Sequence, residues 1–269
     1  MTKPLKLQTE RMLASIDADG IGWVTFNNPA RHNALSLEMW QGMGDIFEHF
    51  EANPQVRTAV MTGAGSKAFV SGADISEFDK KRSSAAQRRE YGEIADRGAK
   101  AMARFSKPLI AMIDGYCIGG GLATALAADI RFATPESSFG IPAAKLGLGY
   151  EYEGLAKLCA LVGPSRARDI MLSARFFPTA EAQSMGLVNF LVPQSELLSE
   201  VTSYAQRIAG NAPLTTLAAK AAVNAWERGG REDDIKRVKA MVDACFDSDD
   251  YKEGRAAFAA KRSPLFKGL

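Results

Sequence analysis

Histidine and cysteine are both scarce in this chain of 269 residues. Its two histidines, His32 and His49, are too few for a histidine-rich site, so we expect no metal centre. The three cysteines, Cys117, Cys159 and Cys245, lie far apart, so no pair has the spacing of metal ligands. Because an odd number of cysteines also argues against a disulfide framework, we expect three reduced thiols, mostly buried.

The chain also lacks a long hydrophobic run and a strong excess of one charge. No segment reaches membrane-spanning length, and the N-terminus does not combine a basic start with a long apolar stretch. The net charge of +2 does not indicate nucleic acid or a membrane surface as a partner. We therefore expect a cytoplasmic protein. The basic residues at 80–89 are predicted to form a solvated surface, with attraction for a polyphosphate as the alternative.

Strand and helix signals alternate along the first two thirds of the chain. Residues 12–26 predict two strands joined by the turn signal Asp19-Gly20. Ser36 suits a helix cap, and apolar residues spaced by three and four follow it over 36–52. The next expected elements are a buried strand at 56–63, a polar helix at about 80–105, a buried strand at 108–115, a helix at 121–128 and a strand at 129–134. This alternation predicts an α/β fold with a layered core.

The last third of the chain is mostly helical. A helix is expected from Pro164, a short helix closed by Gly186 follows, and a last strand covers 188–192. Residues 195–260 predict three or four helices with little strand signal. Such helices have apolar faces and no sheet to cover, so we expect them to pack against another subunit.

Two glycine-containing segments leave main-chain N–H groups without an obvious partner. In FVSGADISEF (69–78), a strand ends at Val70, Gly72 permits an unusual turn, and Ala73 follows. In the triplet 119–121, Gly120 begins a helix, where the helix dipole favours negative charge. Each signal alone more often reflects tight packing, and the triplet lacks the spacing of a dinucleotide-binding fingerprint. Together they predict two donors that stabilise a carbonyl oxygen as it gains charge.

A third segment, FGIPAAKLGLGYEYEG at 139–154, is predicted to be a loop that holds four proton-handling side chains. These are Tyr150, Glu151, Tyr152 and Glu153. In a random protein the glutamates would be surface charges and the tyrosines packing residues. The order and spacing of all three segments is what favours a functional interpretation.

Five segments spread over nearly the whole chain carry a family pattern: PARHNALS (29–36), SGADI (71–75), KPLIAMIDGYCIGGGLATALAADIRFA (107–133), FGIPAAKLGLG (139–149) and ARFFPTAEAQSMGLVN (174–189). The chain thereby resembles the crotonase family, also called the enoyl-CoA hydratase/isomerase superfamily. The resemblance implies a spiral core of ββα turns over 1–194 and a C-terminal helical region over 195–269 that packs across subunits. It also implies self-association as a trimer or a dimer of trimers.

The resemblance implies a substrate as well. The carbonyl oxygen of an acyl-CoA thioester would be bound by the N–H groups of Ala73 and Gly120, and CoA would enter as part of the substrate, with no separate cofactor. By the same resemblance, the residues around the thioester and CoA would be Arg31, Asn33, Ala34, Leu35, Ser71, Asp74, Ile75, Gly119 and Pro142, with Phe258 and Lys261 from a neighbouring subunit.

The chain departs from the family at both catalytic glutamates of its hydratases. The position two residues beyond the triplet is Ala123, and the position after the proline of FGIP is Ala143. Along the loop, Glu151 matches a catalytic aspartate of the family's dienoyl-CoA isomerases, and Tyr150 matches a catalytic tyrosine of methylmalonyl-CoA decarboxylase-like members. Asp74 is a third proton-handling candidate, although a carboxylate there also suits a cap of the turn.

Three functions remain open on the sequence alone. The first is an enoyl-CoA hydratase or isomerase with Glu151 as acid and base, because a glutamate in an apolar pocket has its pKa raised towards neutrality. The second is a CoA-thioester decarboxylase, which forms the same enolate without a base and would use Tyr150 to protonate the product. The third is an acyl-CoA-binding protein without catalytic activity.

Overall fold

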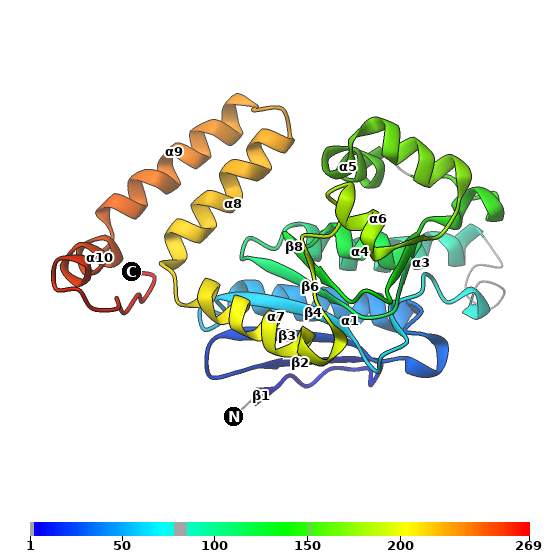
Figure 1. Ribbon diagram of the computed structural model, residues 1–269, viewed down its shortest axis with the longest axis horizontal. Coiled ribbons are helices and arrows are strands. Elements are labelled where there is room, and N and C mark those ends of the chain that lie inside the picture. The colour runs from blue at the N-terminus through cyan, green and yellow to red at the C-terminus, as the bar shows by residue number, and fades with distance from the viewer. Residues whose placement is uncertain (1–2, 78–84, 151) are drawn as a thin grey trace.

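The computed structural model describes residues 3–77, 85–150 and 152–269, and it is built from two sheets surrounded by helices (Figure 1). The larger sheet has seven strands, antiparallel from the first to the third and parallel from there on. Its strands, in spatial order, are β1 (Lys3–Pro4), β2 (Met12–Ile16), β3 (Ile21–Phe26), β4 (Thr58–Gly63), β6 (Leu109–Ile113), β8 (Ile130–Ala133) and β11 (Phe190–Leu191).

The smaller sheet has four strands and contributes the edge at which the candidate site lies. Strands β5, β7 and β9 are parallel neighbours, and β10 is antiparallel to β9. Their carboxyl ends therefore meet at one edge of this sheet. In spatial order the strands are β10 (Phe177–Pro178), β9 (Ser138–Gly140), β7 (Tyr116–Ile118) and β5 (Ala68–Val70).

Helices enclose both sheets and form the C-terminal third of the chain (Figure 1). The α-helices are α1 (Leu37–Ala52), α3 (Ala85–Ala103), α4 (Gly120–Leu126), α5 (Tyr152–Ser173), α6 (Thr179–Ser184), α7 (Gln194–Ala209), α8 (Pro213–Glu227), α9 (Glu232–Asp247) and α10 (Asp249–Ala259), and the 3-10 helices are η1 (Pro29–Arg31), η2 (Ile75–Glu77) and η3 (Pro142–Leu146). None of these described helices is long and apolar enough to cross a membrane.

The central strands of the larger sheet are buried on both faces, which explains their continuous apolar sequences. On one face, Met61 and Ala111 pack in a core shared with α1, α4 and β5. On the other face, Val60 and Ile110 pack in a second core with Val201 and other residues of α7. The buried strands predicted at 56–63 and 108–115 are thus confirmed. The expectation that the helices of 195–260 have no sheet to cover is wrong for α7, because its apolar face packs on this sheet.

The first predicted hairpin and helix are confirmed, and Ser36 occupies the predicted cap position without making a capping bond. Strands β2 and β3 occupy 12–26, and α1 begins at Leu37. Ser36 stands at the N-cap position, yet its hydroxyl makes no capping bond and is fully buried. Instead, the Glu77 carboxylate accepts a 2.8 Å hydrogen bond from the Leu37 N–H. A side chain 40 residues away therefore caps this helix, which local sequence cannot reveal.

The predicted loop over 139–154 is shorter than expected. Helix α5 already begins at Tyr152, and η3 occupies part of the loop before it. Gly163 interrupts α5 with φ of 76° and ψ of 160°, so the helix predicted from Pro164 is the second half of α5. The glycine allows this left-handed conformation, and the proline then suits the first turn of the resumed helix.

Beyond α7, the chain leaves the sheet. Helices α8 and α9 form a hairpin beside the sheet, and α10 and the C-terminus lie near its open end, opposite the α8–α9 turn (Figure 1). Trp226, Phe246 and Phe258 expose 76%, 59% and 88% of their surface on these helices. The four tail helices α7 to α10 agree with the predicted three or four, whereas the domain boundary at 195 stays a prediction.

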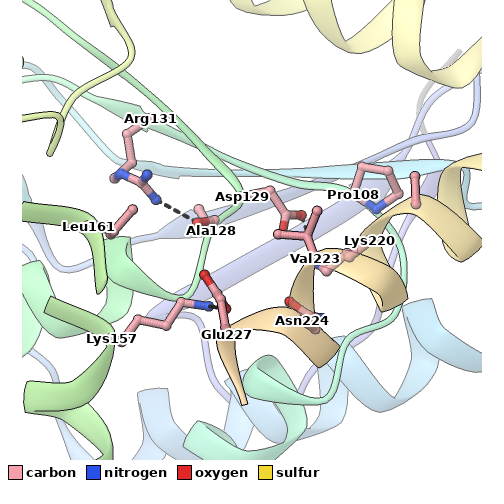
Figure 2. A pocket seen from close by; sticks show the side chains of 11 residues that line it. Pro108, Ala128, Asp129, Arg131, Lys157, Leu161, Lys220, Val223, Asn224 and Glu227 are labelled. Carbon is pink, nitrogen blue, oxygen red and sulfur yellow. Dashed lines mark hydrogen bonds and ion pairs between the residues drawn. The ribbon is translucent and has the colours of Figure 1, made fainter. Parts of the chain in front are cut away.

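A charged cavity of about 270 Å³ lies where α8 meets the core (Figure 2). Lys220 of α8 donates from Nζ to Asp129 Oδ2 and to the carbonyl of Lys107, each at 2.8 Å. Arg131 is almost fully buried beside the cavity and donates to the carbonyls of Ala128 and Leu187. This network fastens α8 to the sheet, and none of the predicted site residues lines the cavity.

Candidate active site

Two turns with glycines of positive φ follow the parallel strands β5 and β7. Gly72 has a φ of 120° and Gly119 a φ of 56°, conformations that side-chain-bearing residues rarely adopt. Each glycine directly precedes one of the predicted donors, Ala73 and Gly120. A methyl group added at Gly120 would lie 3.9 Å from the Ala73 nitrogen, so the two peptide units are close neighbours.

The N–H groups of Ala73 and Gly120 donate no hydrogen bond within the described part of the chain. Their neighbours are paired. The Gly119 N–H donates to the Gly140 carbonyl at 2.8 Å, and the Asp74 N–H donates to the Leu35 carbonyl at 2.9 Å. Two adjoining turns thus each present one unpaired main-chain donor, and unpaired donors of this kind suit a ligand oxygen.

The third glycine of the triplet has a packing role. A methyl group added at Gly121 would lie 2.0 Å from the carbonyl oxygen of Val70, which is closer than any real contact. Helix α4 therefore begins directly against the end of β5. Within the triplet, Gly119 supplies an unusual turn, Gly120 an unpaired N–H, and Gly121 close packing.

The residues before Leu37 form a loop that lies along the first turn. Leu35 pairs with Ala73 as an isolated parallel bridge, and its side chain is fully buried. Asn33 is also fully buried, so its predicted contact with CoA does not come from an exposed side chain. Ala34 is 8% exposed, whereas Arg31 is exposed at the start of the same loop.

The remaining predicted residues lie in different surroundings. Ser71 donates weakly to the Arg31 carbonyl, and Pro142 lies next to Gly119. Phe258 and Lys261 are exposed in and after α10, at the far end of the tail of the same chain (Figure 1). Ile75 opens η2, and its side chain lies outside the described residues.

Tyr150 and Asp74, two of the candidate proton-handling groups, lie within the described residues. Ala143 is 4% exposed and Ala123 is half-buried, and neither carries an acid. Tyr150 is half-buried against the core, and this burial raises the pKa of its hydroxyl, so the group keeps its proton at neutral pH. Glu151 lies outside the described residues. Asp74 accepts bonds from the Ser76 N–H and hydroxyl, which is the turn-capping role.

Comparison with known proteins shows which family the chain belongs to. The family model described as Enoyl-CoA hydratase/isomerase matches residues 17–269. This chain belongs to the enoyl-CoA hydratase/isomerase family. It is 33% identical over 243 residues to a short-chain-enoyl-CoA hydratase of Clostridium acetobutylicum, covering 89% of this chain and 91% of that protein. It is 35% identical over 244 residues to a crotonyl-CoA hydratase of Syntrophomonas wolfei, covering 89% and 92%.

The fold of the chain agrees with that family. A crystal structure of an enoyl-CoA hydratase/carnithine racemase from Magnetospirillum magneticum superposes with a TM-score of 0.88 at 35% identity, covering 97% of each chain. The mixed α/β fold expected from the crotonase resemblance is therefore confirmed. The protein is an enzyme of the enoyl-CoA hydratase/isomerase family, and the family names leave its exact reaction open.

Proposed function

We propose that this enzyme binds an acyl-CoA thioester and stabilises its enolate with the N–H groups of Ala73 and Gly120. The observation that carries the proposal is the pair of adjoining turns in which Gly72 and Gly119 precede these unpaired amides. Two such donors form an oxyanion hole, and removing one donor from the oxyanion hole of other enzymes raises the barrier by about 3 kcal/mol. No cofactor is needed beyond the CoA that the substrate carries.

We further propose that CoA lies along the 29–35 loop near Arg31 and meets Phe258 and Lys261 of a second copy. Within one chain, Phe258 and Lys261 belong to α10 and the segment after it, which lie away from α4 (Figure 1). The 88% exposure of Phe258 favours contact with another copy. A trimer or a dimer of trimers would bring the tail of one subunit to the site of the next.

The favoured reaction is hydration or isomerisation of an enoyl-CoA, with Glu151 moving the proton. Because Ala123 and Ala143 cannot exchange protons, the acid and base must come from elsewhere in the site. The test follows the enone absorbance of short, medium and aryl enoyl-CoAs with wild type and Glu151→Gln. We expect turnover that Glu151→Gln reduces at least about 100-fold. Unchanged absorbance and unmoved double bonds across the panel would exclude both reactions.

Decarboxylation is the second candidate, favoured by the two alanines and by the protonated Tyr150. The bond between the α carbon and the carboxylate would break and carbon dioxide would leave. The electron pair of that bond would stay on the substrate and form the enolate. The Tyr150 hydroxyl would then protonate the α carbon. Carbon dioxide release from malonyl-CoA or methylmalonyl-CoA that Tyr150→Phe abolishes would support this reaction, and no release would exclude it.

A third outcome is binding of acyl-CoA without turnover of any compound tested and without an effect of Glu151→Gln. It would instead indicate an acyl-CoA-binding protein without catalytic activity.

A further inference from the structure

The side chain of Asn33 is fully buried, and both of its polar atoms are used. Its Nδ2 donates to the Ala68 carbonyl at 2.7 Å and to the Ala64 carbonyl at 3.1 Å, and its Oδ1 accepts from the Asn28 N–H at 2.9 Å. The amide thus joins the loop before α1 to the start of β5. It contributes nothing to the surface at which a substrate would arrive.

The surrounding backbone leaves a space for this amide. A methyl group added at Gly63 would lie 2.7 Å from Asn33 Nδ2 and 2.2 Å from the Ala68 carbonyl, so only glycine fits there. Asn33 itself has a φ of 55°, a left-handed conformation that asparagine tolerates better than most residues. Backbone and side chain at this position are therefore both fitted to the joint.

The joint continues to the first donor through hydrogen bonds between the two segments. The Ser71 N–H donates to the His32 carbonyl at 3.1 Å, the Leu35 N–H to the Gly72 carbonyl at 2.7 Å, and the Asp74 N–H to the Leu35 carbonyl at 2.9 Å. The last two bonds lie on either side of Ala73. Leu35 therefore fixes the peptide that carries the Ala73 N–H, and Asn33 holds the loop two residues before Leu35.

We propose that Asn33 is a positioning residue that sets the direction of the Ala73 N–H by anchoring the 28–35 loop on β5. The inference rests on the proposed function, because it gives that N–H a thioester oxygen to bind. It assigns Asn33 an effect on recognition of the carbonyl oxygen, separate from recognition of the CoA part.

The test compares binding of butyryl-CoA with S-butyl-CoA, which has the same chain but a thioether in place of the thioester. Only the thioester has an oxygen for the N–H groups of Ala73 and Gly120, so calorimetric affinities of the pair report recognition of that oxygen, and the Asn33 variants test the share that depends on the 28–35 loop. Asn33→Gly removes the amide while tolerating the positive φ. We expect wild type to prefer the thioester and Asn33→Gly to lose about tenfold of that preference, the size of one such hydrogen bond.

Two further variants complete the experiment. Asn27→Gly is the control, because the Asn27 Nδ2 also donates to a main-chain carbonyl, but that carbonyl belongs to Glu10, before β2 and outside the 28–35 loop. Its preference should equal that of wild type. Asn33→Ser removes the amide and its two donor bonds without burying a charge, so it replaces Asn33→Gly if the latter does not fold, as judged by thermal unfolding.

The outcomes separate this proposal from the proposed function. If wild type prefers the thioester and the Asn33 variants keep that preference, or lose affinity for both ligands equally, the positioning role is wrong and the thioester site stands. If wild type binds neither compound, or binds both equally, the oxyanion proposal fails and the role of Asn33 fails with it.

Discussion

At the scale of single residues, consecutive glycines have unequal sensitivity to the same change. A methyl group at Gly121 would lie 2.0 Å from the Val70 oxygen, whereas at Gly120 its nearest neighbour is 3.7 Å away. We expect Gly121→Ala to lower the free energy of unfolding by about 3 kcal/mol and Gly120→Ala by under about 1 kcal/mol. Urea unfolding of the two variants measures this difference, and equal losses would contradict the packing role of Gly121.

Tyr150 gives a prediction about pH. Burial raises the pKa of its hydroxyl above the ordinary value near 10, so the unfolded chain ionises this group first as pH rises. The protonated tyrosine therefore stabilises the fold fully below about pH 10 and progressively less above it. The difference in unfolding free energy between wild type and Tyr150→Phe should shift against wild type between about pH 9 and 11.

That experiment has an internal control. Burial also raises the pKa of Cys117, which adds its own alkaline loss to both proteins. Because this contribution is common to wild type and Tyr150→Phe, it cancels in their difference. A difference that stays flat over this pH range would show that the Tyr150 hydroxyl is not protected from ionisation by the fold.

Sequence reasoning at this scale succeeded where the backbone acts and failed where distant side chains act. The turn at Gly72 was predicted because a glycine directly follows a strand end, and the positive φ of Gly72 confirms it, whereas the turn at Gly119 was not predicted. The capping role of Glu77 and the buried amide of Asn33 were missed, because their partners are 30 to 40 residues away in the chain. A sequence signal for the Asn33 contact was weak: it consisted of a polar residue within an otherwise apolar segment and of Gly63 at the end of β4.

At the scale of elements, the ion pair between Lys220 and Asp129 is the more buried of two pairs that attach α8 within the described residues; the other joins Lys157 and Glu227. Lys220 and Asp129 side chains are 12% and 30% exposed, and Asp129 Oδ2 also accepts from the Leu109 N–H at 2.7 Å. We expect Lys220→Met to lower the free energy of unfolding by about 2 kcal/mol, because it leaves Asp129 short of a charged partner. Thermal and urea unfolding both report this change.

A surface pair of the same residue types is the control. Lys252 and Asp249 lie 2.8 Å apart, the same distance as the first pair, but are 73% and 76% exposed. Lys252→Met should change the unfolding free energy by less than about 0.5 kcal/mol. Similar effects of the two lysine substitutions would mean that α8 is held mainly by its apolar contacts.

The elements themselves were mostly predictable, for a physical reason. Strands buried on both faces have continuous apolar sequences, as β4 and β6 do, and amphipathic helices such as α1 repeat at three and four residues. The first half of α5 was missed because it follows a run of glycines and carries a weak apolar pattern. Tertiary packing against the core, through buried Leu158, stabilises it instead.

At the scale of the whole molecule, the helices α8 to α10 leave apolar surface exposed. An apolar groove of about 640 Å³ runs between α8, α9 and α10, and Phe246 and Phe258 are among its lining residues. We expect light scattering with size-exclusion chromatography to give a single particle of three or six times the 29.0 kDa chain mass. Phe246→Asp should shift the particle towards monomer, whereas a monomeric wild type would remove the inter-subunit part of the proposed site.

Assembly is also where the sequence gives least. Exposed aromatic residues on helices indicate that something covers them, but the geometry of contact between copies is not encoded in local pattern. Local sequence does not decide between Glu151 and Tyr150 as the proton donor either, because the two residues are adjacent and share the same sequence pattern. Family membership indicates an enoyl-CoA hydratase/isomerase-like enzyme, and the variants of Glu151 and Tyr150 test which of the proposed reactions it carries out.

Because the Ala73 and Gly120 amides belong to the main chain, every side-chain replacement except proline retains them. The side chains at Ala123 and Ala143 can be replaced one at a time, whereas the turns at Gly72 and Gly119 have a positive φ that favours glycine. The side chains that transfer protons can therefore change in evolution while the two proposed main-chain donors are kept. New reactions on the same class of substrate would then arise by substitution of the side chains around Ala73 and Gly120.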